Sequence, residues 1–271
     1  MAGAKALFTS IQIIPHFGNA DIGGYDIYWN VEARGFNPTF TVEVADTESG
    51  PVWKSLTPAA ITDNFLLDAS ERVMTFDPLR WFRVNVFNGS TLVATSSSVD
   101  NRNRLDHRDY LYYRELLRRW RLQLIKYVGE PGYLFRRRVF GKICSQCTDE
   151  ILKQPASSEC QICFGVGIEH GYFPEVEMLA EWLNGPPRQA PTTLESSGPS
   201  QVDKKAIFLF PVPDVKFLDI WMDKGTGYRY EVEKVEIPET DTYRGSPVRQ
   251  KVELSRLPPN HPVYNIPLTH A

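Results

Sequence analysis

The chain has 271 residues, of which 42% are hydrophobic and 23% are charged, as in ordinary soluble proteins with two or three small domains. It contains no run of about 18 apolar residues, so we expect no membrane span. The net charge is −3, but residues 101–143 carry twelve Lys and Arg against four Asp and Glu. This segment therefore has a balance of +8 and the remainder −11. We expect the segment to face an acidic partner, either nucleic acid or protein, or to pair with the chain's own acidic parts.

Residues 1–100 predict an all-β domain, because β-branched and aromatic residues recur in short runs separated by turn residues. In residues 39–45, Phe40, Val42 and Val44 alternate with polar residues, which predicts one buried and one exposed face. A second inward row is expected at Ile27, Trp29, Val31 and Ala33. The expected strands are 6–14, 26–33, 39–45, 65–68, 81–87 and 91–97.

Three features of this region resemble fibronectin type III domains. They are Trp29 in an early strand, the turn at 49–51 before Trp53, and the strand W-F-R-V-N-V at 81–86. The resemblance implies a sandwich of the immunoglobulin or fibronectin type III kind. No cysteine pair lies in this region, so an antibody-type domain is not expected.

Residues 101–143 predict a basic helix followed by an arm. The helix is expected from Asp109 to about Lys126, with Leu116, Trp120, Leu124 and Tyr127 on one stripe at helical spacing. Glycine and proline at 129–132 end it. In the arm, the consecutive arginines at 136–138 could meet phosphate groups or the carboxylates of a neighbouring subunit.

The four cysteines are Cys144, Cys147, Cys160 and Cys163, with the spacing C-x2-C, twelve residues, C-x2-C. Two such knuckles can direct four thiolates at one ion. We therefore predict a structural zinc ribbon over 144–183, in which the glycines after Cys163 allow backbone N–H groups to reach the sulfurs. A turn is expected between the knuckles, around residues 155–158.

Three other uses of the four cysteines have the same residues but different requirements. Two disulfides need an oxidising compartment, and no signal peptide is recognised near residue 1. A thioredoxin-like pair would stand alone in a βαβ context. An iron–sulfur cluster is compatible with the same spacing. Four protein ligands leave no open position, so a zinc ion here is expected to support folding and not catalysis.

Residues 184–205 are rich in Pro, Ser, Thr, Gln and Gly and predict a linker. Residues 206–271 predict a small β domain with an extended C-terminal arm. Its strands are expected at 207–210, 217–222, 228–237 and 248–254, with a hairpin turn at 223–227. The proline-rich tail after Leu257 has no pattern for a core of its own, so we expect it to reach a neighbouring protein.

Catalytic and nucleotide-binding motifs are missing from the sequence. It contains no phosphate-binding glycine loop, no H-E-x-x-H and no G-x-S-x-G. The five histidines are scattered; His170 follows the second knuckle closely, but four cysteines already suffice as ligands. Asp219 and Asp223 could flank one strand, but this spacing alone is insufficient evidence for a catalytic acid/base pair. We therefore do not expect an enzyme.

The string C-S-Q-C-T-D-E, continued by S-S-E-C-Q-I-C-F-G-V-G-I-E-H-G-Y-F-P up to Pro174, resembles a segment of structural proteins of tailed bacteriophages. In these proteins, two cysteine knuckles precede a glycine-bearing turn and a Gly-Tyr-Tyr/Phe-Pro element. The hairpin at 221–237 resembles small β-barrel connector proteins. The first knuckle lacks the glycines of the second, so a symmetric chaperone-type zinc repeat is not supported.

This resemblance implies a virion structural protein of the neck or head–tail connector, in a homo-oligomeric ring assembled in the host cytoplasm. Expected partners are other neck or tail proteins such as portal, adaptor or tail terminator, and DNA in the channel. One alternative is a tail, baseplate or fibre-anchoring component. A second alternative is a zinc-ribbon protein that binds nucleic acid.

Overall fold

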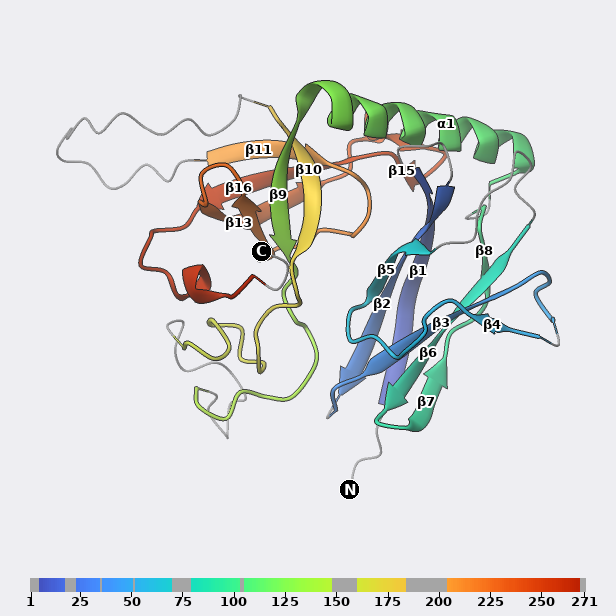
Figure 1. Ribbon diagram of the computed structural model, residues 1–271, viewed down its shortest axis with the longest axis horizontal. Helices are drawn as coiled ribbons and strands as arrows, with labels where there is room; N and C mark the ends of the chain where they lie inside the picture. The colour runs from blue at the N-terminus through green and yellow to red at the C-terminus, as the bar shows by residue number, and fades with distance from the viewer. Residues whose placement is uncertain are drawn as a thin grey trace. The chain divides into compact units, whose positions relative to one another are not determined.

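The computed structural model describes residues 5–17, 23–34, 36–50, 52–69, 79–102, 105–147, 160–183 and 204–268 (Figure 1). The turn predicted between the knuckles lies outside these ranges, as does nearly all of the predicted linker. The chain divides into two compact units. The first comprises Met1–Arg118, Arg138–Ser145 and Val212–Asp214, and the second comprises Arg119–Arg137, Gln146–Pro211 and Val215–Ala271. The fold is mainly β, as expected.

The first unit contains two antiparallel sheets. One has the strand order β1-β2-β5, and the other has the order β4-β3-β6-β7, with β8 paired to β6. Six of these strands lie close to the predicted limits, and only the two-residue strands β4 and β8 were not predicted. The bounds are β1 Lys5–Phe17, β2 Gly23–Arg34, β3 Thr39–Ala45, β4 Lys54–Ser55, β5 Phe65–Ala69, β6 Trp81–Asn88, β7 Thr91–Thr95 and β8 Val99–Asp100.

The predicted alternation in the first unit is confirmed. In β3, Phe40, Val42 and Val44 are buried while the residues between them are half-buried, and the inward row of β2 is buried from Ile27 to Ala33. Aromatic contacts join the two sheets. The rings of Trp29 and Phe40 lie 5.4 Å apart edge to face, and those of Tyr25 and Phe82 lie 5.3 Å apart. Such pairs add to the stabilisation from burial alone.

One α-helix is present among the described residues: α1, His107–Gln123, which continues into a π-helical turn, η1, Leu124–Val128. The carboxylate of Asp106 accepts a hydrogen bond of 2.8 Å from the N–H of Asp109, which caps the first turn. Within the described ranges, no helix has the length and apolar character that a membrane span requires.

The buried stripe of this helix differs from the predicted one. It consists of Tyr110, Tyr113, Leu117, Trp120 and Leu124. Leu116 is only half-buried, and Tyr127 is 82% exposed, so its predicted place on the stripe is wrong. The cause is the π-helical turn, which adds a residue to the last turn and rotates Tyr127 away from the packed side.

The second unit contains a closed six-stranded barrel in the order β10-β11-β16-β13-β12-β9 (Figure 1). Every strand contributes at least one side chain with no exposed surface, so the core is filled by apolar groups. These residues are Leu134, Ala180, Ile207, Ile220, Tyr230 and Val252. The bounds are β9 Gly129–Phe135, β10 Val176–Trp182, β11 Lys204–Leu209, β12 Ile220–Asp223, β13 Arg229–Glu236 and β16 Gln250–Arg256; η2 (Glu239–Asp241), β14 (Thr242–Tyr243) and β15 (Ser246–Pro247) precede β16.

Two barrel strands come from parts of the chain that the sequence assigned to the arm and the ribbon. Strand β9 starts in the glycine- and proline-containing segment that ends the helix, and Gly132 is required there because the indole of Trp221 packs on it. A Cβ on Gly132 would lie 2.1 Å from Cζ2 of Trp221. The predicted hairpin turn between β12 and β13 is confirmed.

The C-terminal segment packs on the second unit up to Leu268, so its apolar residues find a core within the chain. The expected contact with a neighbouring protein stays a prediction. A short 3-10 turn, η3 (Pro262–Asn265), places Val263 and Ile266 in a core with Tyr133, Phe135, Val166, Tyr172 and Ile220. The guanidinium of Arg229 donates hydrogen bonds to the carbonyl oxygens of Val263 and Ile266. A segment without a core pattern thus obtains its core from the barrel.

The arginine run at 136–138 is partly used inside the fold. Arg136 is 3% exposed. Burial raises the pKa of the Asp219 carboxyl, the positive charge of Arg136 opposes part of this increase, and the resulting pKa is about 6. The two Asp219 oxygens accept hydrogen bonds of 2.7 Å from the backbone N–H groups of Arg137 and Lys216. Asp219 therefore holds the end of β9 against the loop before β12.

The Asp219 carboxyl should give the second unit a pH-dependent stability. Its folded pKa of about 6 lies above its ordinary value of 3.8, so the folded state binds more protons than the unfolded state between these pH values. The free energy of unfolding should therefore fall as pH rises from 4 to 6, by on the order of 2 kcal/mol from this group. Asp219→Asn removes this titration but leaves one backbone N–H without an acceptor, which costs about 1–3 kcal/mol.

The measurement is urea unfolding of the wild type and Asp219→Asn at several pH values between 4 and 7. Comparison at equal pH cancels the titration of the cysteines. The variant should be most destabilised at pH 4 and less so at pH 7. A difference that stays constant across this range contradicts the assignment. Asp46→Asn, at a side chain that is 80% exposed, is the control.

Candidate metal centre

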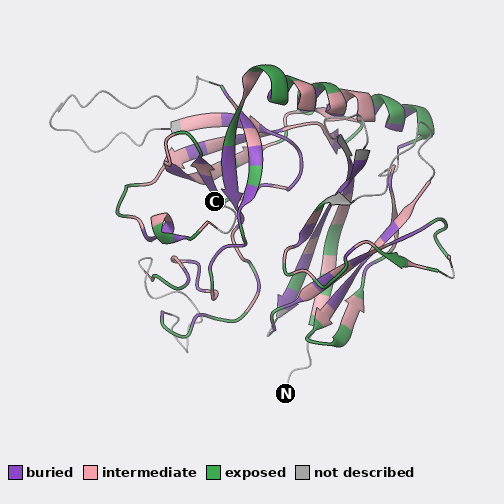
Figure 2. Ribbon diagram, in the orientation of Figure 1, coloured by how far each residue is buried: buried purple, intermediate pink, exposed green. Residues whose placement is uncertain are grey.

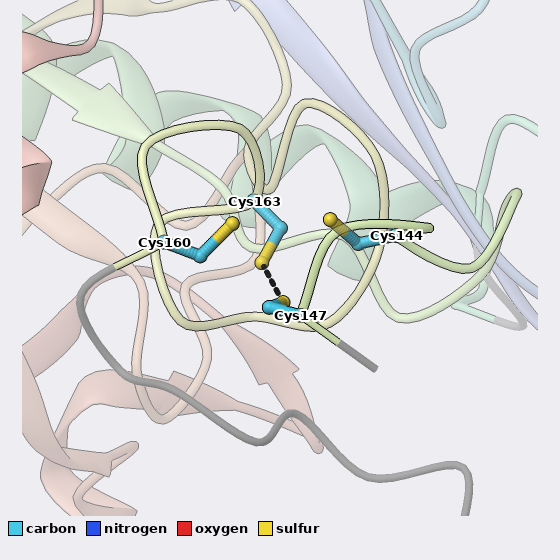
Figure 3. A group of neighbouring side chains, drawn as sticks. All are labelled: Cys144, Cys147, Cys160 and Cys163. Atoms are coloured by element: carbon cyan, nitrogen blue, oxygen red, sulfur yellow. Dashed lines mark hydrogen bonds between the residues drawn. The ribbon is translucent and has the colours of Figure 1, made fainter. Parts of the chain in front are cut away.

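The structure brings together all four cysteines that the spacing selected. The ligand atoms of Cys144, Cys147, Cys160 and Cys163 all lie within 4.8 Å of one another. Figure 3 shows the thiols directed at a common centre, with Sγ of Cys147 and Sγ of Cys163 3.1 Å apart. Cys160 is half-buried and the other three are buried. No histidine or carboxylate joins this group among the described residues, and His170 is exposed.

The cluster has dimensions that suit a tetrahedral ion. Four thiolates at Zn–S distances of about 2.3 Å have sulfurs about 3.8 Å apart, and the observed limits of 3.1 and 4.8 Å enclose this value. Four sulfurs in a mostly buried site can hold zinc or iron. The arrangement could thus bind a metal ion through four protein ligands, with structural rather than catalytic chemistry.

The second knuckle is a tight backbone turn that points N–H groups at its sulfurs. The N–H of Phe164 donates to the carbonyl of Cys160 at 2.8 Å, and the N–H of Val166 donates to that of Cys163 at 2.9 Å. Gly165 and Gly167 have φ angles of 82° and 84°, which glycine adopts without strain. Their N–H groups hydrogen-bond the sulfur of Cys163. The predicted role of these glycines is confirmed.

Hydrogen bonding and burial shift the pKa values of the two thiols of this knuckle, Cys160 and Cys163, in opposite directions. The backbone N–H of Cys163 is the main cause that lowers the pKa of Cys160 to about 7. Burial raises the pKa of Cys163. A metal ligand must be a thiolate, so the N–H donors favour the ligating form, and a bound cation would offset the cost of burying the second charge.

The element Gly171–Pro174 follows the knuckle and supports it. Gly171 has a φ of 55°, and a Cβ there would lie 2.4 Å from the carbonyl oxygen of Cys163. The N–H of Phe173 donates to the carbonyl of Arg136 at 2.9 Å, and Tyr172 pairs with Arg137 in an isolated bridge. The element therefore connects the second knuckle to the strand end that leads to the first knuckle.

The C-terminal segment contacts the same knuckle. The amide of Asn265 donates a hydrogen bond of 2.8 Å to the side chain of Gln161, which lies between Cys160 and Cys163. Val166 and Tyr172 share their core with Val263 and Ile266. Sequence reasoning missed Gln161, Asn265 and Arg229, because their partners are distant along the chain and no local pattern marks them.

Comparison with known proteins adds no family to this geometry. A scan against protein-family models finds no match, and a search of curated proteins finds no relative. The candidate centre therefore rests on the spacing of the cysteines and on the arrangement of their sulfurs.

We expect the purified chain to contain one metal ion, which elemental mass spectrometry will measure. Cys160→Ser removes one of four ligands and should reduce the bound metal well below one ion per chain, with a lower free energy of unfolding. Ser145→Ala, at an exposed position between the first two cysteines, is the control and should keep the metal. A metal content near zero in the wild type would contradict the site. Detection of iron instead of zinc would keep the site and change the assigned metal.

Removal of the metal should also loosen the C-terminal segment, since the knuckle forms part of its core. With a chelator present, hydrogen exchange should increase in residues 160–174 and 257–268, whereas the paired strands β3 and β6 of the first unit should keep their protection. Equal protection of residues 257–268 with and without metal would show that the barrel alone holds this segment.

Proposed function

We propose that this chain is a structural component of a tailed bacteriophage particle, in the neck or head–tail connector. Its cysteine cluster would hold zinc through Cys144, Cys147, Cys160 and Cys163. The role is that of a scaffold in a ring of copies, without an enzymatic activity.

The observation that carries this proposal is one shared core. Two separate stretches of the sequence resemble phage structural proteins, the cysteine segment ending at Pro174 and the hairpin at 221–237. In the fold, Val166 and Tyr172 from the first stretch share a core with Ile220, which directly precedes the second stretch, and Met222 of the second stretch packs against that core. Parts of both stretches thus meet in one core on the wall of the six-stranded barrel.

For the first unit, we propose a sandwich of the immunoglobulin or fibronectin type III kind. The strand orders β1-β2-β5 and β4-β3-β6-β7, with β8 paired to β6, support it, since the chain crosses repeatedly between a three-stranded and a five-stranded sheet. The contacts Trp29–Phe40 and Tyr25–Phe82 between the two sheets support it further. Such a domain would serve as an attachment surface, which also suits the alternative of a fibre-anchoring or tail component.

The test is mass spectrometry of purified particles that have been separated into heads and tails. We expect several copies of the chain in each particle. Because the protein would lie at the junction, both the head fraction and the tail fraction should retain some of it. Recovery with tails alone would favour the tail or baseplate alternative. Absence from particles, together with salt-dependent DNA binding by the monomer, would reject the proposal in favour of a zinc-ribbon nucleic-acid-binding protein.

A further inference from the structure

The solvent side of α1 and η1 carries a set of exposed residues, and Figure 2 shows exposed positions recurring along this helix. Together with the half-buried Glu115, its members up to Lys126 recur at intervals of three and four residues, so they lie on one side of the helix. The stripe extends over about 28 Å at 1.5 Å per residue. We call this set the helix stripe: Arg108, Tyr112, Arg119, Gln123, Lys126 and Tyr127.

The helix stripe has the composition of an interface. Tyr112 is 55% exposed and Tyr127 82%, and tyrosine and arginine are enriched where proteins meet. Next to Tyr112, Leu111 adds apolar surface that is 40% exposed. The π-helical turn is what brings Tyr127 onto this side.

The charge of the helix stripe is positive and selects the partner. Arg108, Arg119 and Lys126 are exposed. Glu115 lies on the same side of the helix and forms an ion pair with Arg118 at 2.8 Å, and the three basic residues outnumber it. The chain outside residues 101–143 carries −11, so another copy offers a complementary surface. A chain with a net charge of −3 is a poorer long-range match for the phosphate backbone of DNA.

The same charges exclude one kind of contact. A two-fold symmetric pair that places one stripe on another would bring like charges together. The stripe must therefore meet a different surface of the second copy, and head-to-tail contacts of this kind close into rings or extend into filaments.

The area of the stripe limits the strength of this contact. A helix about 10 Å wide and 28 Å long offers about 300 Å², less than the roughly 800 Å² per partner of a stable pair. We expect a weak, salt-sensitive contact that closure of a ring reinforces.

We propose that the helix stripe is the subunit contact through which one copy of this chain binds the acidic surface of the next copy. This inference rests on the proposed ring-forming role. The sequence indicated the arginines at 136–138 as a subunit contact, but Arg136 is buried. The inference therefore assigns the contact to the exposed side of the helix.

The experiment is sedimentation velocity of the full-length metal-loaded protein over a concentration series, at about 50 mM and about 0.5 M salt. Self-association should weaken at least about tenfold at high salt. The triple variant Arg108→Glu, Arg119→Glu, Lys126→Glu should show the same loss at low salt. Tyr127→Ser, which keeps the charge, should weaken association several-fold at both salt concentrations.

The matched control is the triple variant Lys5→Glu, Lys54→Glu, Lys142→Glu, which changes the net charge equally at three exposed positions outside the stripe. It should associate within about twofold of the wild type. Circular dichroism verifies that all variants fold. A helix-stripe variant that associates like the wild type overturns the inference while leaving the ring role intact. A wild type that stays monomeric at every concentration overturns the inference, and particle composition then decides the proposed function separately. Loss of duplex DNA binding in the helix-stripe variant, with unchanged self-association, assigns the stripe to nucleic acid.

Discussion

Tyr133 and Phe135 on β9, with Ile220 on β12, bury one face of the barrel wall against two segments that have almost no regular structure of their own. One segment is the second cysteine knuckle with Gly171–Pro174, and the other is the C-terminal stretch around η3. Neither can satisfy its apolar groups alone, because each has too few residues for a core. Arg229 adds polar interactions to this packing, since its guanidinium donates hydrogen bonds to two carbonyl oxygens of the C-terminal stretch. The barrel therefore serves as the template on which the metal centre and the chain end are ordered.

Arginines serve three different purposes in this fold, and their surroundings distinguish them. Arg136 is buried, and its charge offsets part of the cost of burying the Asp219 carboxylate. Arg229 lies 5.1 Å from the ring of Phe135 and 5.7 Å from that of Tyr264, with its N–H groups directed at backbone oxygens. The arginines of the helix stripe remain exposed. A count of basic residues over 101–143 cannot separate these purposes, although it locates the segment that contains most of them.

The parts of the fold that local patterns specify were predictable, and the parts that depend on distant partners were not. Alternation fixes the face of β3 because successive side chains point to opposite sides of a strand. The cysteine cluster follows from spacing alone. Strand β9 was missed because Pro131 and its neighbouring glycines indicate a break, and only pairing with β10 and β12 makes the segment a strand. Arg136 gives no local sign of burial, since Asp219 is far along the chain. Tyr127 was misplaced because a single π-helical turn changes the helical repeat.

The candidate centre and the helix stripe make different demands on the chain, and the fold keeps them on different elements. A four-thiolate site needs a backbone that bends sharply around its sulfurs, which glycines with positive φ permit at the cost of regular structure. A surface proposed to bind the next copy of the chain in a fixed direction needs a rigid support. The helix provides that support because Tyr113, Leu117 and Trp120 anchor its inner side. The metal would thus stabilise what the barrel cannot fold by itself. The helix presents charges whose mutual repulsion disfavours a two-fold pair and permits head-to-tail closure.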